Sequence, residues 1–84
     1  MVKLLYFAWV REQVGRGEEE VSPPGEVATV GALVDWLAER DEAHAAAFAE
    51  RSRLRAAVDG VFTGFDASIA GAREVAIFPP VTGG

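Results

Sequence analysis

Residues 74–84 read Glu-Val-Ala-Ile-Phe-Pro-Pro-Val-Thr-Gly-Gly. They begin with an apolar strand pattern and end in two residues that have no side chain. Residues 74–78 alternate between two apolar faces, which predicts a strand. The two prolines that follow favour extended polyproline geometry and would end a central strand. The glycines carry no side chain, so they fit a narrow channel and allow close approach of another backbone. We therefore expect residues 81–84 to form an extended tail that presents the terminal carboxylate of Gly84.

The rest of the chain is sized for one small domain, which we place at residues 1–80. Half of the 84 residues are apolar, none is cysteine, and the formal net charge is −5. No apolar run is long enough for a membrane span, and an acidic surface repels phosphate backbones. We therefore expect a cytoplasmic protein with no membrane or nucleic-acid partner, no bound metal, and an acidic surface that suits docking onto a basic protein.

Periodicity predicts the remaining elements. Residues 2–9 alternate like a central strand, and residues 11–14 resemble a helical turn that stops at Gly15. After a weak edge strand at 18–22 and a Pro-Pro-Gly turn, Thr29 is a plausible N-cap for a helix that lasts to about Arg40. Further elements are a short helix, a strand and a short strand, at residues 43–50, 54–58 and 62–65 respectively.

One main helix with several strands predicts an α+β, two-layer fold built on a mixed sheet. The first and last strands are the most apolar, so we place them side by side at the centre of the sheet. The tail would then leave from the stiffest part of the molecule. The predicted core residues are Val2, Leu4, Tyr6, Leu33, Val34, Leu37, Val58, Val75 and Ile77.

The sequence contains no recognisable set of catalytic side chains, phosphate loop or metal-ligand spacing. His44, the sole histidine, is expected on a helix surface, and Glu18 to Glu20 on a solvated strand edge. Trp36 is expected at the flank of the main helix. Arg51, Arg53 and Arg55 are interpreted as one face of a strand, serving either solubility or a basic patch beside a partner site.

Two features point to function. Phe7, Phe78 and also Phe62 are predicted on the sheet face opposite the main helix, where an aromatic cluster indicates an interface or, alternatively, a second small core beneath a loop. The terminal carboxylate is ionised at neutral pH and is a poor electrophile until another protein activates it, for example by adenylation. Four extended residues reach roughly 13 Å, far enough to enter a partner's pocket.

Three segments carry a family resemblance: Phe-Ala-Trp-Val-Arg-Glu at 7–12, Ala-Ala-Val at 56–58, and Val-Ala-Ile-Phe-Pro-Pro-Val-Thr-Gly-Gly at 75–84. Together with length and element order, they resemble the small subunit of molybdopterin synthase. The resemblance implies the ubiquitin-like β-grasp fold. It also implies that Gly84 passes through an acyl-adenylate to a thiocarboxylate, whose sulfur builds the molybdopterin dithiolene from cyclic pyranopterin monophosphate.

The resemblance further implies three partners: the large synthase subunit with the catalytic groups, an adenylating enzyme related to ubiquitin activators that uses ATP, and a sulfur donor protein. The chain itself would be a non-catalytic sulfur-donor subunit without a bound cofactor. The tail residues expected to thread into partners are Pro80, Val81, Thr82 and Gly83. The residues expected on the partner-facing patch are Phe7, Arg11, Phe62 and Phe78.

The sequence departs from the family pattern at Asp59, where Asn is frequent, and at residues 72–74, where an acidic turn is common. Three alternatives stay open. The chain could carry sulfur for thiamine or tRNA thiolation, although the Phe-Pro-Pro-Val-Thr segment argues against it. It could be a ubiquitin-like modifier joined to lysines through Gly84, or a passive adaptor with an inert tail.

Overall fold

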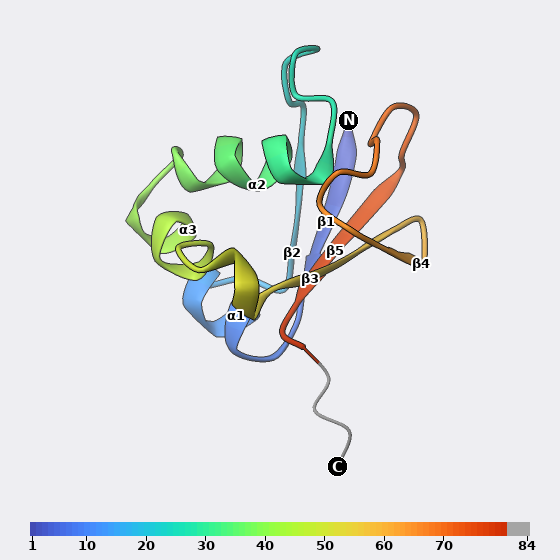
Figure 1. Ribbon diagram of the computed structural model, residues 1–84. Coiled ribbons are helices and arrows are strands. Elements are labelled where there is room, and N and C mark those ends of the chain that lie inside the picture. Colours follow the sequence, from blue (N-terminus) through green and yellow to red (C-terminus); the bar gives the residue numbers. More distant parts are fainter. Residues whose placement is uncertain (81–84) are drawn as a thin grey trace.

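The first and last strands lie side by side and parallel in the middle of a five-stranded sheet (Figure 1). The computed structural model describes residues 1–80. The sheet order is β2-β1-β5-β3-β4, and every neighbouring pair other than β1–β5 is antiparallel. The strands are β1 (Val2–Tyr6), β2 (Glu18–Val21), β3 (Arg55–Val58), β4 (Val61–Thr63) and β5 (Glu74–Phe78). This arrangement confirms the predicted α+β fold and the β-grasp architecture that the family resemblance implied.

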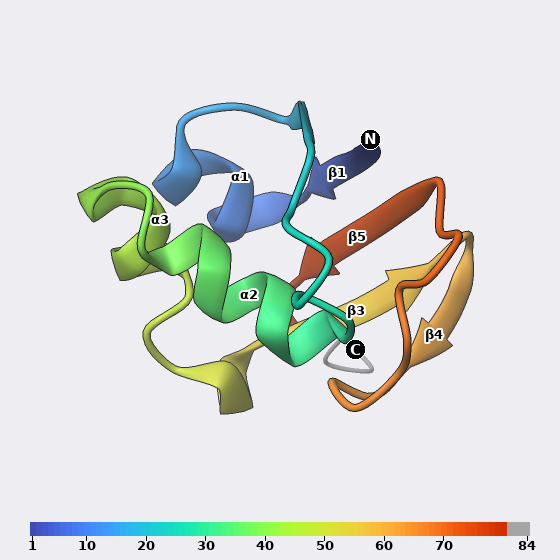
Figure 2. The ribbon, with the colours of Figure 1, turned by 90° about the horizontal axis from the view of Figure 1, so that it is seen from above.

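The helices gather on one face of the sheet, as the view from above shows (Figure 2). They are α1 (Ala8–Val14), α2 (Val30–Ala38), α3 (Glu42–Ala47) and a 3₁₀ turn η1 (Arg51–Arg53). The Thr29 hydroxyl accepts a hydrogen bond from the Ala32 amide at 3.1 Å, which confirms the predicted N-cap of α2. Gly15 ends α1 with φ at +94°, a left-handed conformation that glycine adopts without steric cost.

The strand register separates the sheet into a core face and an open face. On the core face, Leu4 lies beside Val75 and Tyr6 beside Ile77, and all four are buried. Of the nine predicted core residues, eight are buried, while Val58 is half-buried and packs against the edge of the cluster. The core also contains buried residues outside the predicted core set: Val10, Val14, Val30, Phe48, Leu54 and Ile69.

Two predictions of where an element begins or ends were wrong. The first strand ends at Tyr6 instead of residue 9, because Ala8 adopts a positive φ of 52° and starts α1. Val10 and Val14 then share one buried helix face, four residues apart, and this burial outweighs the alternating pattern. Arg51 and Arg53 belong to η1, so the expected three-arginine strand face does not exist, and β3 begins only at Arg55.

Smaller boundary errors have the same origin. The helix predicted at 43–50 spans Glu42–Ala47, because Phe48 turns into the core, where it is 6% exposed. The short strand predicted at 62–65 is Val61–Thr63, and the edge strand and the last strand agree with prediction to within a residue.

The prediction for His44 was wrong. Its side chain is buried, at 4% residue exposure, between α3 and the sheet. The expectation of a solvated glutamate edge was wrong for Glu19, whose side chain is only 5% exposed and contacts His44. Hydrophobic patterning cannot reveal such a pair, because each polar group tolerates burial only when the other satisfies it. Trp36 is half-buried at the flank of α2, as expected, and lies beneath the Arg40 guanidinium.

Among the described residues, no helix is both long enough and apolar enough to cross a membrane.

Candidate functional site: an apolar hollow beside Pro79 and Pro80

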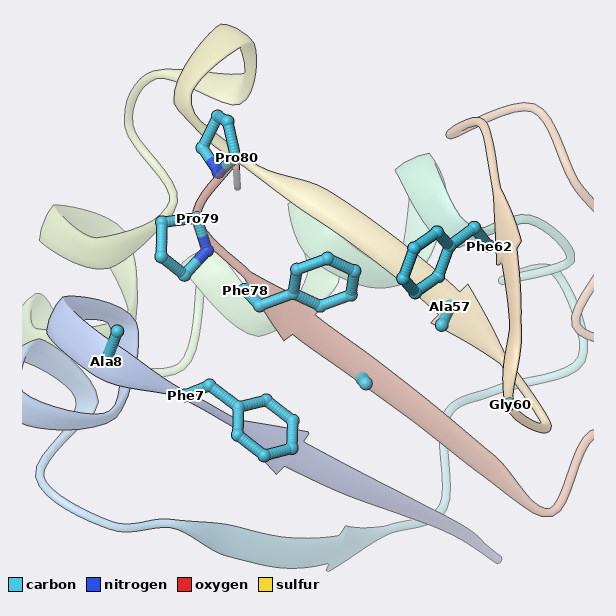
Figure 3. Close-up of a pocket in the computed structure, with 9 residues that line it drawn as sticks. Phe7, Ala8, Ala57, Gly60, Phe62, Phe78, Pro79 and Pro80 are labelled. Carbon is cyan, nitrogen blue, oxygen red and sulfur yellow. The ribbon is translucent and has the colours of Figure 1, made fainter. Parts of the chain in front are cut away.

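The open face of the sheet carries an apolar hollow of about 590 Å³ (Figure 3). Its floor is formed by Ala57 and Ala76, which are direct neighbours across β3 and β5. Because alanine side chains are short, the larger groups around them leave a depression. The lining residues are Phe7, Ala8, Ala57, Gly60, Phe62, Ala76, Phe78, Pro79 and Pro80. None of them has a titratable side chain, so this surface can dock a partner but supplies no acid, base or nucleophile.

Three phenylalanines from three parts of the chain converge on this hollow (Figure 3). Phe7 follows β1, Phe62 lies on the edge strand β4, and Phe78 ends β5. The rings of Phe62 and Phe78 pack with centroids 5.5 Å apart. Phe62 is 77% exposed and Phe7 48% exposed. In the described part of the chain no loop covers these rings, which favours the predicted interface over a second small core.

The turn between β3 and β4 places Phe62 on this face. Asp59 and Gly60 both have positive φ, at 49° and 83°, as a tight two-residue hairpin requires. One carboxylate oxygen of Asp59, Oδ1, accepts hydrogen bonds from the amides of Arg73 and Glu74, at 2.9 and 3.0 Å. The two departures from the family pattern therefore touch each other, and together they tie the hairpin to the start of β5.

Pro79 and Pro80 are half-buried and line one end of the hollow. Pro80 is thus the one predicted threading residue that the structure describes. It lies next to the aromatic patch, which consists of Phe7, Phe62 and Phe78. Val81, Thr82, Gly83 and Gly84 lie outside the described residues, so the predictions for them remain predictions. What the structure establishes is that the last described residues, Pro79 and Pro80, lie beside this apolar hollow.

Arg11 is not part of this hollow. It is exposed on α1 and lines a separate shallow depression with Glu12, Gly15, Arg16 and Gly17. The family resemblance placed Arg11 near the partner-facing patch, and its role in partner binding stays a prediction.

The arginine that does adjoin the patch is Arg55, whose role the sequence pattern left undecided. Arg55 lies directly opposite Phe78 across the strands and, with Phe62, lines a second hollow of about 210 Å³. Its guanidinium donates to the carbonyl of Leu54 at 2.8 Å, which holds it at the sheet edge. Arg51 and Arg53 are engaged elsewhere. Arg51 pairs with Asp35, and Arg53 lies over the Trp9 ring at 4.8 Å from its centroid.

A small mixed sheet crossed by one main helix, with its first and last strands parallel at the centre, defines a ubiquitin-like β-grasp domain. The ThiS family matches residues 4–84 of this chain, and the chain belongs to that family. Two relatives match over the whole of both chains, and each is a molybdopterin synthase sulfur carrier subunit. The one from Escherichia coli strain K12 is 43% identical and the one from Haemophilus influenzae 31%. These relatives confirm the family that the sequence resemblance indicated.

The fold is also that of a solved archaeal protein. SAMP1 from Haloferax volcanii, a small archaeal modifier protein, superposes with a TM-score of 0.72 at 28% identity. The match covers 99% of this chain and 98% of that one.

Proposed function

We propose that this chain is the sulfur carrier and small subunit of a cytoplasmic molybdopterin synthase. The observation that carries the proposal is the position of the apolar hollow beside Pro79 and Pro80, at the base of a segment that ends in two glycines. A partner that covers Phe7, Phe62 and Phe78 would also lie beside Pro80, the last described residue before the Gly-Gly end. The full-length similarity to two sulfur carrier subunits supports the same interpretation.

In this proposal the reacting group is the terminal carboxyl of Gly84. An adenylating enzyme joins that carboxylate to the α-phosphate of ATP and releases pyrophosphate. A sulfur donor protein then supplies sulfur at the oxidation level of sulfide, which attacks the acyl carbon, displaces AMP and leaves a thiocarboxylate on Gly84. Inside the large subunit, the thiocarboxylate sulfur displaces an oxygen substituent from a carbon of cyclic pyranopterin monophosphate and forms a thioester. Water then cleaves the bond between the acyl carbon and the sulfur, so that the sulfur stays on the pterin and Gly84 is released as a carboxylate. The apolar lining of the hollow agrees with this division of labour, because the described surface holds partners and the catalytic groups come from them.

The direct test is to measure the intact mass of the full chain by mass spectrometry after incubation with its adenylating enzyme, ATP and a sulfur source. The expected mass gain is that of one oxygen replaced by sulfur, and it should be lost on incubation with large subunit and pterin precursor. A variant lacking Gly84 is the matched control and should gain nothing. No gain with any sulfur source would refute the carrier role. A gain without transfer to the pterin would instead favour a carrier for another thiolation pathway.

A second candidate function is protein modification, because the fold is shared with a small archaeal modifier protein. Activation of Gly84 to the adenylate would be common to both functions. They differ in the acceptor, which is a lysine amine for a modifier and sulfur for a carrier. Higher-mass species containing this chain, resistant to reducing agent and dependent on Gly84, would support the modifier.

A further inference from the structure

His44 on α3 is buried with a carboxylate at each of its two ring nitrogens. Nε2 lies 2.8 Å from Glu19 Oε2, and Nδ1 lies 2.8 Å from Asp41 Oδ1. Asp41 also caps α3, because the same oxygen accepts the His44 amide at 2.9 Å. The three residues come from β2, from the helix cap and from the helix itself, so they join α3 to the edge of the sheet.

Further groups converge on Glu19 from the surrounding elements. The Tyr6 hydroxyl, at the end of β1, donates to Oε2 at 2.7 Å. Arg40, which follows α2, and Arg16, which precedes β2, face Oε1 at 3.4 and 3.7 Å. Burial, together with Glu19, raises the pKa of Tyr6 well above its ordinary value, so this hydroxyl remains a donor.

The other neighbours of His44 are uncharged. The ring packs against those of Tyr6 and Phe48, with centroids 6.4 and 6.2 Å away. The helix α1 packs on α3 and buries only Val10 and Val14, whereas its charged residues are exposed. Glu19 and Asp41 are therefore the charged groups that directly face the imidazole.

This geometry selects one protonation state. A neutral imidazole has one N–H and one lone pair, so one of its nitrogens would direct a lone pair at a carboxylate oxygen 2.8 Å away. The imidazolium donates from both nitrogens and satisfies both carboxylates. A buried cation is tolerated only when it is paired and hydrogen-bonded, and His44 meets both conditions.

We propose that His44 is held as an imidazolium between Glu19 and Asp41, and that it forms a pH-sensitive latch fixing α3 against β1 and β2. The state of Glu19 supports this. Burial alone would raise the pKa of Glu19, but hydrogen bonds from His44 and Tyr6, with the charges of His44 and Arg40, lower it below its usual value. The carboxylate that faces Nε2 is therefore charged at neutral pH.

The latch has a mechanical consequence. Tyr6, which donates to Glu19, directly precedes Phe7, whose ring lines the apolar hollow on the other face of the sheet. Loss of one proton leaves the His44 ring a single N–H for two carboxylates, so its hydrogen bond to either Glu19 or Asp41 is lost. Either loss weakens the link that joins α3 to β2 and to the end of β1. An effect of this loosening on partner docking would rest on the proposed function, whereas the latch itself does not.

The direction of the pH effect follows from proton linkage. In the proposed state, the folded chain retains at His44 a proton that the neutral histidine of the unfolded chain lacks. Unfolding then releases that proton, so folding stability falls as pH rises. The unfolding equilibrium constant should rise about tenfold per pH unit while that difference persists.

The first test is nitrogen NMR of the ¹⁵N-labelled full chain at about pH 7.5, where an ordinary histidine is mostly neutral. Both ring nitrogens of His44 should show the signature of protonated nitrogen. A spectrum with one protonated and one lone-pair nitrogen would overturn the proposal. This measurement needs no variant, so it decides even if substitutions at the cluster prevent folding.

The second test is urea unfolding between about pH 6.5 and 8.5 for the unchanged chain, Glu19→Gln and Glu20→Gln. The amide introduced by Glu19→Gln could accept from a ring N–H or donate to a ring lone pair, so this variant should flatten the pH slope. Glu20 is an exposed residue on the same strand, so Glu20→Gln is the matched control and should keep the slope. A flat profile in the unchanged chain, or an equal slope in Glu19→Gln, would refute the latch.

Discussion

Phe62 and Phe78 pack against each other on the open face of the sheet, with ring centroids 5.5 Å apart and an angle of 43° between the rings. They come from the edge strand β4 and the central strand β5, with β3 between them. The pair forms one wall of the apolar hollow, and Phe7 adds a third ring (Figure 3). Removal of one ring should therefore disturb the surface more than the fold.

We expect Phe78→Ala to weaken binding of the large synthase subunit by about 2 kcal/mol or more, as loss of an aromatic interface anchor typically does. Titration calorimetry on the purified subunits measures this directly. Val61→Ala is the matched control, because Val61 is a 64%-exposed apolar residue next to Phe62 that does not line the hollow. Equal losses for both variants, or unfolding of Phe78→Ala, would argue against a docking role.

Addition of one residue after Gly84 should abolish thiocarboxylate formation. The activated carboxyl would then be displaced by roughly 3.3 Å, one extended residue, from its required position. The readout is the mass gain after incubation with adenylating enzyme, ATP and sulfur source. A one-residue extension at Met1 is the control, since Met1 is 83% exposed and lies outside the hollow, and it should leave the mass gain unchanged.

Leu37→Ala should lower the free energy of unfolding by about 2–5 kcal/mol, because Leu37 is fully buried on the inner face of α2. Urea denaturation followed by circular dichroism provides the measurement. Glu39→Ala, an exposed change at the end of the same helix, should stay within about 0.5 kcal/mol of the unchanged chain. A near-neutral Leu37→Ala would mean that α2 does not contribute its inner face to the core.

Asp59→Ala should destabilise the fold by about 1–3 kcal/mol, since the amides of Arg73 and Glu74 would lose their acceptor. Alanine would also have to adopt the positive φ of 49° at this position. Asparagine retains an acceptor oxygen and tolerates this conformation, so Asp59→Asn should cost much less. Thermal unfolding of the two variants side by side tests the difference, and equal Tm values would show that the side chain is unimportant.

Acid should remove the stabilisation that ionised Glu19 provides. The pKa of Glu19 is lowered in the fold, where hydrogen bonds from His44 and Tyr6 outweigh the opposing effect of burial. Its contribution is therefore complete above the ordinary value of about 4.3 and is lost as pH falls through the folded value. Glu19→Gln should be less stable than the unchanged chain by about 1–3 kcal/mol near pH 7. That gap should shrink at about pH 3, where a constant gap would contradict the mechanism.

The sequence pattern correctly predicted the elements that depend on a single local rule. Residues 74–78 alternate cleanly and form β5, and Thr29 caps α2 because its hydroxyl reaches an amide three residues away. The aromatic patch was also predictable, because Phe7, Phe62 and Phe78 were left on the face that no predicted element could cover. The C-terminal motif was enough to indicate the family, and relatives of full length confirmed it.

Only the tertiary structure decided what depends on groups distant in the chain. The strand pattern continues to residue 9, yet α1 begins at Ala8 and buries Val10 and Val14 on its inner face. His44 and Glu19 are 25 positions apart, and neither is a burial candidate without the other, because an unpaired polar group bears the full cost of leaving water. The sequence thus determined the strands, the main helix and the family, whereas the buried charge cluster and the placement of Arg11 and Arg55 followed from packing in three dimensions.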